Sequence, residues 1–89
     1  LAAGIAKRAD DIAARILEAE KAGAGGCRPQ ELSRAKAELA VARNNGITEL
    51  DFDPIVTEMV LARAEIRSEN LLAERQYAAI HGIRCLEEK

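Results

Sequence analysis

The stretch Cys27-Arg28-Pro29-Gln30-Glu31-Leu32 decides how this chain folds, and Phe52-Asp53-Pro54 repeats its signal further along. Proline at the first helical position loses no hydrogen bond, because the amide that it lacks would have no partner there. Each proline therefore marks the start of a helix and not an interruption. The two signals predict three helices, over residues 3–22, 29–44 and 54–81.

The first two segments carry their apolar residues on one helical face. In the first segment these residues are Ile5, Ala9, Ile12, Ala13, Ile16 and Leu17. This segment ends in Gly23-Ala24-Gly25-Gly26, where glycine suits a left-handed cap followed by a flexible turn. In the second segment the apolar residues are Leu32, Ala35, Leu39 and Ala42, and Asn44-Asn45-Gly46 is expected to end the helix as a cap and turn.

The third segment is the longest, and Gly82 is expected to cap its end. Its apolar periodicity predicts a buried face formed by Ile55, Met59, Ala62, Ile66, Ala73, Tyr77 and Ile80. Asn70 interrupts this face, and two interpretations stay open. A slightly rotated seam would leave Asn70 half exposed, whereas a buried asparagine would fix helix register or oligomer order.

The link at residues 47–53 contains the apolar residues Ile47, Leu50 and Phe52, so we expect it to lie over the open end of the bundle. Phe52 would plug that end, and Asp53 would cap the third helix. The sequence thus predicts an all-α protein, an antiparallel three-helix bundle with a long third helix. We expect one domain over residues 1–89, and a chain that begins at Leu1 and not at Met suggests a fragment of a larger protein.

The predicted core is thin, because alanine dominates an apolar content of 48% and the chain has one Phe, one Tyr and no Trp. Burying one large apolar side chain contributes roughly 1.5–3 kcal/mol, so a few residues carry much of the stability. We expect these to include Ile12, Ile16, Leu32, Leu39, Ile66 and Leu71.

The third segment outruns the other two, at roughly 42 Å against roughly 24–30 Å for a rise of about 1.5 Å per residue. The excess would leave an interaction face only partly covered, and a second copy, another domain or a partner helix could cover it. Alternatively, the link at residues 47–53 shifts the third helix and removes the mismatch. The residues of the expected interaction face are Leu71, Leu72, Tyr77 and Ile80.

Two cysteines, Cys27 and Cys85, with a single histidine, His81, are too few for a zinc site. The cysteines either form a disulfide or stay as free thiols. A disulfide requires Cα atoms within about 7 Å, which needs either a shifted third helix or a chain reversal at Gly82.

The composition of the chain and the spacing of its reactive residues argue against nucleic-acid binding, a membrane span and catalysis. The net charge of −2, with both signs interspersed, gives no basic stripe for nucleic acid, and no apolar run is long enough to span a membrane. Cys85 and His81 lie four residues apart, but no orienting carboxylate is evident, and His81 is better explained as a cap. Glu58 and Glu65 are better explained as a solvated face. We therefore expect no enzyme activity, no cofactor and no small-molecule substrate.

Three short runs carry a family resemblance: Ala19-Glu20-Lys21-Ala22-Gly23-Ala24, Cys27-Arg28-Pro29-Gln30-Glu31-Leu32 and Ala35-Lys36-Ala37-Glu38-Leu39. Over roughly residues 12–80 the chain resembles an alanine-rich helical domain of unknown function in bacterial envelope lipoproteins, which often precedes an OmpA-like domain. The chain departs from this family in its longer, apolar link, and it contains neither the lipid-carrying cysteine nor the OmpA-like domain.

The resemblance implies an oxidising location, in the periplasm or at the periplasmic face of the outer membrane, and favours pairing of Cys27 with Cys85. The first functional hypothesis is a non-catalytic spacer or protein-interaction module of the cell envelope that binds a protein partner or itself through the third helix. The alternative is a cytoplasmic helical adaptor or regulatory subunit with both thiols reduced. A small enzyme is the third and weakest hypothesis.

Overall fold

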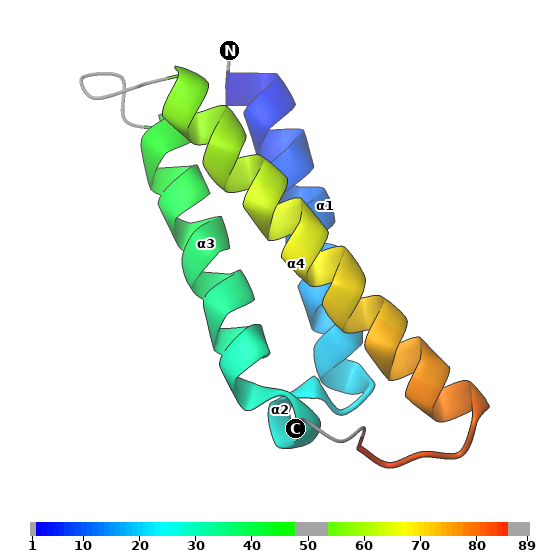
Figure 1. Cartoon of the computed structure of the whole chain (residues 1–89). Coiled ribbons are helices and arrows are strands. Elements are labelled where there is room, and N and C mark those ends of the chain that lie inside the picture. Colours follow the sequence, from blue (N-terminus) through cyan, green and yellow to red (C-terminus); the bar gives the residue numbers. More distant parts are fainter. Residues whose placement is uncertain (1, 48–53, 86–89) are drawn as a thin grey trace.

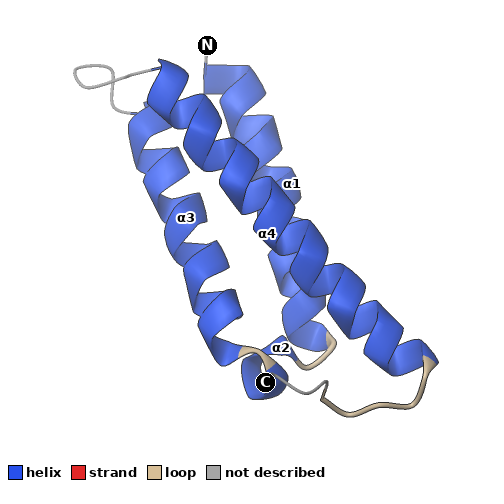
Figure 2. Ribbon diagram, in the orientation of Figure 1, coloured by secondary structure: helices blue, strands red, loops and turns tan. Residues whose placement is uncertain are grey.

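The structure, a computed structural model, describes residues 2–47 and 54–85, and these ranges contain four helices and no strand (Figure 2). The helices are α1 (Ala2–Lys21), α2 (Ala24–Cys27), α3 (Pro29–Ile47) and α4 (Pro54–Ile80). The three long helices lie side by side, and α3 runs in the opposite direction to α1 and α4 (Figure 1). The all-α class is therefore confirmed, and the short helix α2 is an element that the sequence analysis did not predict.

The proline signals are correct, because α3 begins at Pro29 and α4 begins at Pro54. The predicted end of the second segment is wrong. Asn44, Asn45 and Gly46 continue the helix, which extends to Ile47. The expected roles of Phe52 and Asp53 in the link fall outside the described residues.

Glycine provides the turn between α1 and α2. Gly23 adopts a left-handed conformation with φ of 100°, and its N–H donates a 3.0 Å hydrogen bond to the carbonyl oxygen of Glu20. Its own carbonyl oxygen then accepts a 3.0 Å hydrogen bond from the N–H of Cys27, so the predicted flexible turn is a single helical turn. Ala24 at the start of that turn is buried, which anchors the turn to the core.

Gly82 caps the end of α4, as predicted from the sequence, and it also reverses the chain, which was one of the two alternatives left open. It has a φ of 66°, and the N–H of Ile83 donates a 2.8 Å hydrogen bond to the carbonyl oxygen of Ala78. The N–H of Gly82 donates to the carbonyl oxygen of Ala79 at 3.3 Å, which completes a Schellman motif. The segment after this cap turns back beneath the bundle toward α2 (Figure 1).

The core faces of α1 and α3 largely agree with the prediction. The buried apolar residues of these two helices recur at three- and four-residue steps: Ala9, Ile12, Ile16, Ala19, Leu32, Ala35, Leu39 and Ala42. Ile5 and Ala13 pack against this cluster while partly buried. Leu17 was placed on the buried face, but half of its surface is exposed because it lies at the edge of the packed stripe.

The predicted core face of α4 is wrong. Five of its large residues are 51% to 79% exposed: Ile55, Met59, Ile66, Tyr77 and Ile80. The buried face, here called the inner seam, is instead a strict heptad pattern of mostly small or polar residues: Thr57, Leu61, Ala64, Ser68, Leu71, Arg75 and Ala78. The large apolar residues that α4 buries most completely are thus Leu61 and Leu71. Ile66 was expected to carry much of the stability, but it is exposed.

The exposed face is called here the outer seam and comprises Ile55, Met59, Ala62, Ile66, Asn70, Ala73, Tyr77 and Ile80. Five inner residues each follow an outer residue by two positions, which is about 200° around a helix of 3.6 residues per turn. The two seams therefore lie on opposite sides of α4. Asn70 is exposed on the outer seam, so it is not buried within the described part of the chain.

Burying a polar side chain of the inner seam costs little free energy where that side chain forms hydrogen bonds, as Ser68 does. The Ser68 hydroxyl donates a 3.0 Å hydrogen bond to the carbonyl oxygen of Glu65 and accepts one of 3.3 Å from Arg15 of α1. Their small neighbours let the helix backbones approach closely. Ser68 thus has hydrogen-bond partners inside the packed inner seam, whereas the buried hydroxyl of Thr57 has none among the described residues.

Candidate functional site

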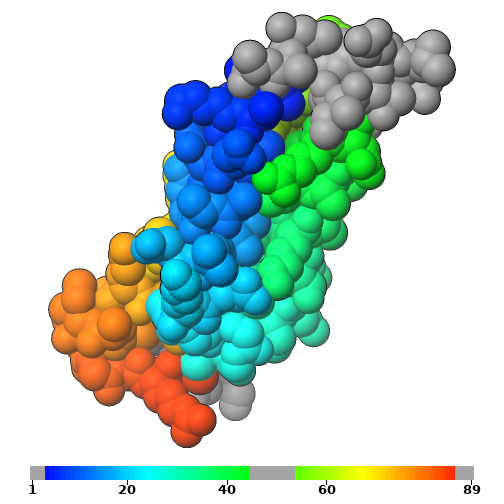
Figure 3. All heavy atoms as spheres, turned by 180° about the vertical axis from the view of Figure 1, so that it is seen from behind, coloured from blue at the N-terminus to red at the C-terminus, as the bar shows by residue number. Residues whose placement is uncertain are grey.

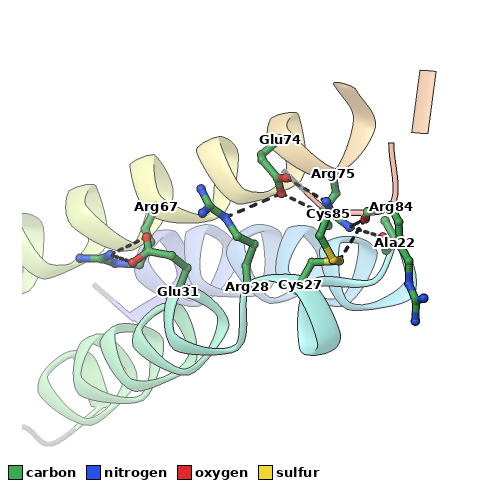
Figure 4. Close-up of polar contacts among 9 residues, drawn as sticks. All are labelled: Ala22, Cys27, Arg28, Glu31, Arg67, Glu74, Arg75, Arg84 and Cys85. Carbon is green, nitrogen blue, oxygen red and sulfur yellow. Dashed lines mark hydrogen bonds and ion pairs between the residues drawn. A yellow bond between two sulfur atoms is a disulfide. The ribbon is translucent and has the colours of Figure 1, made fainter. Parts of the chain in front are cut away.

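A disulfide joins Cys27 of α2 to Cys85 after α4, and the two Cα atoms lie 5.3 Å apart (Figure 4). Of the two routes to this bridge that the sequence left open, the structure shows the chain reversal at Gly82. Because Cys85 has no free thiol, the dyad of Cys85 with His81 that the sequence analysis disfavoured is not formed. The disulfide fixes the returning segment beneath the bundle.

Arg75 of the inner seam lies next to this disulfide and is only 3% exposed. Its guanidinium donates hydrogen bonds to the carbonyl oxygens of Ala22 and Arg84, at 3.3 and 3.2 Å (Figure 4). It also forms a two-pronged pair with the Glu74 carboxylate, at 2.7 and 2.8 Å. One buried side chain thus ties together the end of α1, α4 and the returning segment. Arg75 was not predicted from the sequence, although its position in the heptad of Leu61, Ser68 and Ala78 indicates that it faces inward.

Two further arginines fix α4 against its neighbours. Arg8 of α1 donates to the carboxylates of Glu65 and Glu58 of α4, with nitrogen–oxygen distances of 2.8 to 3.2 Å. On the opposite side, Arg67 of α4 donates to Glu38 and Glu31 of α3, at 2.8 to 3.2 Å. Glu58 and Glu65 are therefore parts of an ion-pair cluster and not only a solvated face. These partly exposed pairs set the rotation of α4, while each contributes modest stability.

The same contacts perturb two carboxylates. The hydrogen bond from Arg8 lowers the pKa of Glu65, and partial burial opposes this shift. The hydrogen bond from Arg75 lowers the pKa of Glu74, again against desolvation, with help from the charges of Arg75 and Arg28. In both cases the ionised carboxylate is favoured in the folded chain.

Stability is therefore expected to fall in acid. A carboxylate with a lowered folded pKa stabilises the fold above its unfolded pKa of about 4.3, and that contribution is lost as the pH falls through the folded value. Urea midpoints should stay level from about pH 6 to 8 and drop below about pH 4.5. Glu74→Gln should flatten that drop, whereas Glu69→Gln, at an exposed position, should leave it unchanged. Equal acid dependence in both variants would contradict the assignment.

The expected interaction face is only partly where the sequence analysis placed it. Tyr77 and Ile80 are exposed, Leu72 is half-buried against the core, and Leu71 is 4% exposed and belongs to the inner seam. The prediction that Leu71 belongs to the interaction face is therefore wrong, because Leu71 packs in the core with Leu61. The exposed apolar surface instead continues toward the start of α4 through Ile66 and Met59.

A second apolar surface lies on the back of the molecule, where α1 and α3 are neighbours (Figure 3). It is an open groove of about 550 Å³, lined by residues that include Ala13, Leu17, Leu39 and Ala40. The ion pair between Lys36 and Glu20, at 2.9 Å, joins α3 to α1 at this groove. Leu17 apart, the groove offers little exposed apolar side chain, so the outer seam of α4 is the stronger candidate for binding.

Residues 2–47 and 54–85 were searched for metal-binding groups and for membrane-spanning helices. No group of three or more His, Cys, Asp or Glu side chains there is arranged to hold a metal ion. Among the same residues, every helix is too short or too polar to serve as a membrane span. Comparison of the chain with protein-family models, with curated proteins and with solved structures finds no match.

Proposed function

We propose that this chain is a non-catalytic module of a bacterial cell-envelope protein, an antiparallel three-helix bundle with a long third helix that binds protein through the outer seam of α4. The observation that carries the proposal is the pair of opposed seams on α4. One seam builds the bundle, and the other presents Met59, Ile66, Tyr77 and Ile80 to solvent.

The outer seam is more apolar than the fold requires. Exposed apolar residues scattered singly are ordinary, but here they recur along one face of a 27-residue helix. A contiguous apolar stripe with charged borders is typical of a protein-binding surface. The isoleucine, methionine and tyrosine side chains of this seam would stabilise a complex by leaving water, which they do not do in the isolated chain.

The disulfide supports the envelope location. Bridges between cysteines persist in oxidising compartments such as the periplasm and are rare in the cytosol. The bridge also favours the envelope module over the cytoplasmic adaptor, which would keep Cys27 and Cys85 reduced. Mass measured with and without alkylation, on protein isolated from its own cells without reductant, separates the two, and two free thiols would favour the adaptor.

Met59 gives a direct test, because it is the only methionine of the chain and half of its surface is exposed on the outer seam. If a partner covers this seam, peroxide should oxidise Met59 to the sulfoxide at least about five-fold more slowly in the producing cells than in the isolated chain. The isolated chain is diluted until sedimentation shows a monomer. Mass spectrometry of the Met59 peptide gives the rate.

Ile66→Glu provides the control, since a charge in the centre of the outer seam should abolish the protection of Met59 in cells. Ser33→Glu, at an exposed position on α3, should retain it. Equal oxidation rates in cells and in the isolated monomer would contradict the proposed function.

A further inference from the structure

We propose that the outer seam of α4 pairs with the outer seam of a second copy of this chain, in a parallel arrangement about a two-fold axis that runs along the helix. The inference rests on the proposed function and names the partner. It follows from the signs of the charges on the two borders of the seam and from the position of one asparagine within it.

The two borders of the seam carry opposite surplus charge. With Ile66 at the centre, Glu58 and Glu65 lie on one border and Arg63 lies on the other, at 100° per residue. Both glutamates bind the single guanidinium of Arg8, so two negative charges meet one positive charge and one negative charge remains. Arg63 is exposed and forms no ion pair with residues 2–47 or 54–85. Beside it, Arg67 and Arg34 balance the carboxylates of Glu31 and Glu38, so the charge of Arg63 remains as a positive surplus.

Symmetry decides which borders meet. A two-fold axis parallel to the helices brings the acidic border of one copy against the basic border of the other. Glu58 then faces Arg63 of the second copy, five residues further along, which is where bordering residues of parallel paired helices form ion pairs. In an antiparallel pair, by contrast, acidic meets acidic and basic meets basic. The charges therefore favour the parallel pair.

Asn70 supports the same arrangement. It lies in the outer seam between Ile66 and Ala73 and is exposed in the single chain. In a parallel pair, equivalent residues face each other, so its amide can donate to and accept from the amide of the second copy. A single asparagine in such a seam fixes register and oligomer order at some cost in stability. In an antiparallel pair Asn70 would face a residue of different number and lose this partner.

The apolar residues of the outer seam extend along most of α4, so two copies of the helix could pack together over most of their length. Met59 and Ile66 occupy the first half of the seam, and Tyr77 and Ile80 occupy the second half. A helix of 27 residues is about 40 Å long at a rise of about 1.5 Å per residue. The segment that follows α4 turns toward α2 (Figure 1).

Sedimentation of the isolated chain over a wide concentration range tests the pair. We expect a reversible dimer, and we expect Glu58→Lys or Arg63→Glu alone to raise the dissociation constant at least about ten-fold through like-charge contacts. An equimolar mixture of the two variants should recover dimerisation, because each introduced charge then meets an opposite one. Glu18→Lys, a charge reversal at an exposed position of α1, serves as the control and should change nothing.

Orientation is tested by Ala62→Cys and Ala73→Cys, made separately with the native disulfide left oxidised. In the parallel pair each variant should cross-link to itself under mild oxidation, because equivalent Cα atoms in the seam come within about 7 Å. Cross-linking only in a mixture of the two variants would show an antiparallel pair and overturn the inference.

Two other outcomes also overturn it. Open polymers in place of dimers would indicate docking of the outer seam into the groove between α1 and α3. A chain that stays monomeric at every concentration would exclude self-pairing. If Met59 is nevertheless protected in cells, the proposed function stands and the partner is a different protein, so the two proposals fail separately.

Discussion

Replacing Cys27 and Cys85 together with alanine is expected to lower the free energy of unfolding by about 4 kcal/mol, because their bridge closes a long loop in the unfolded chain. The two cysteines are 58 residues apart in sequence. A domain of this size has a total stability near the lower end of about 5–15 kcal/mol, so the variant should lose much of its folded population at 37 °C. The disulfide compensates for a core built largely from alanine.

Urea denaturation at neutral pH measures this loss. Cys27→Ala alone should destabilise about as much as the double variant, because removal of either sulfur opens the same loop, so the two effects are not additive. The loss should also free the returning segment, and amide hydrogen exchange should then speed up at Ile83, whose N–H is bonded to Ala78. A change of less than about 1 kcal/mol would show that the bridge does not hold the fold.

Local signals in the sequence were sufficient to locate the long helices. Pro29 and Pro54 begin helices because a missing amide costs nothing there, and Gly82 ends one because only glycine adopts its φ without strain. The reversal at Gly82 was likewise one of two stated routes to the disulfide. These features depend on residues close together in the chain, which is why spacing alone predicts them.

The core face of α4 could not be predicted in the same way. Periodicity selects the most apolar stripe, and on α4 that stripe is the outer seam of Met59, Ile66 and their neighbours. The bundle instead buries Ser68 and Arg75, whose hydrogen-bond partners lie 53 residues away in α1 and at its end. These distant partners offset the cost of burying Ser68 and Arg75, and the residues next to them in the sequence do not show which partners the fold will bring near.

The candidate binding surface on α4 was also predicted only in part from the sequence. Tyr77 and Ile80 were expected to be only partly covered because of the length of the third segment, but Ile66 and Met59 were assigned to the core. The length of a helix can predict that its end projects beyond the bundle, but it cannot predict a second apolar face along the helix. A signal was present nevertheless, since the buried residues from Thr57 to Ala78 recur in a strict heptad on the side of the helix opposite the apolar stripe.

Truncation of Leu61 to alanine is therefore expected to cost about 3–4 kcal/mol, in the range for a fully buried leucine that leaves a cavity. Truncation of Ile66 to alanine should change the free energy of unfolding by less than about 0.5 kcal/mol, because this side chain is 59% exposed. The two positions lie five residues apart on one helix, so the pair compares the inner and outer seams with little else changed.

The comparison of these two variants by urea denaturation, at a concentration where the chain is monomeric, tests most directly whether the inner seam holds the fold and leaves the outer seam for binding. We predict a large loss for Leu61→Ala and almost none for Ile66→Ala. An equal or larger loss for Ile66→Ala would contradict the account, because the outer seam would then be part of the core.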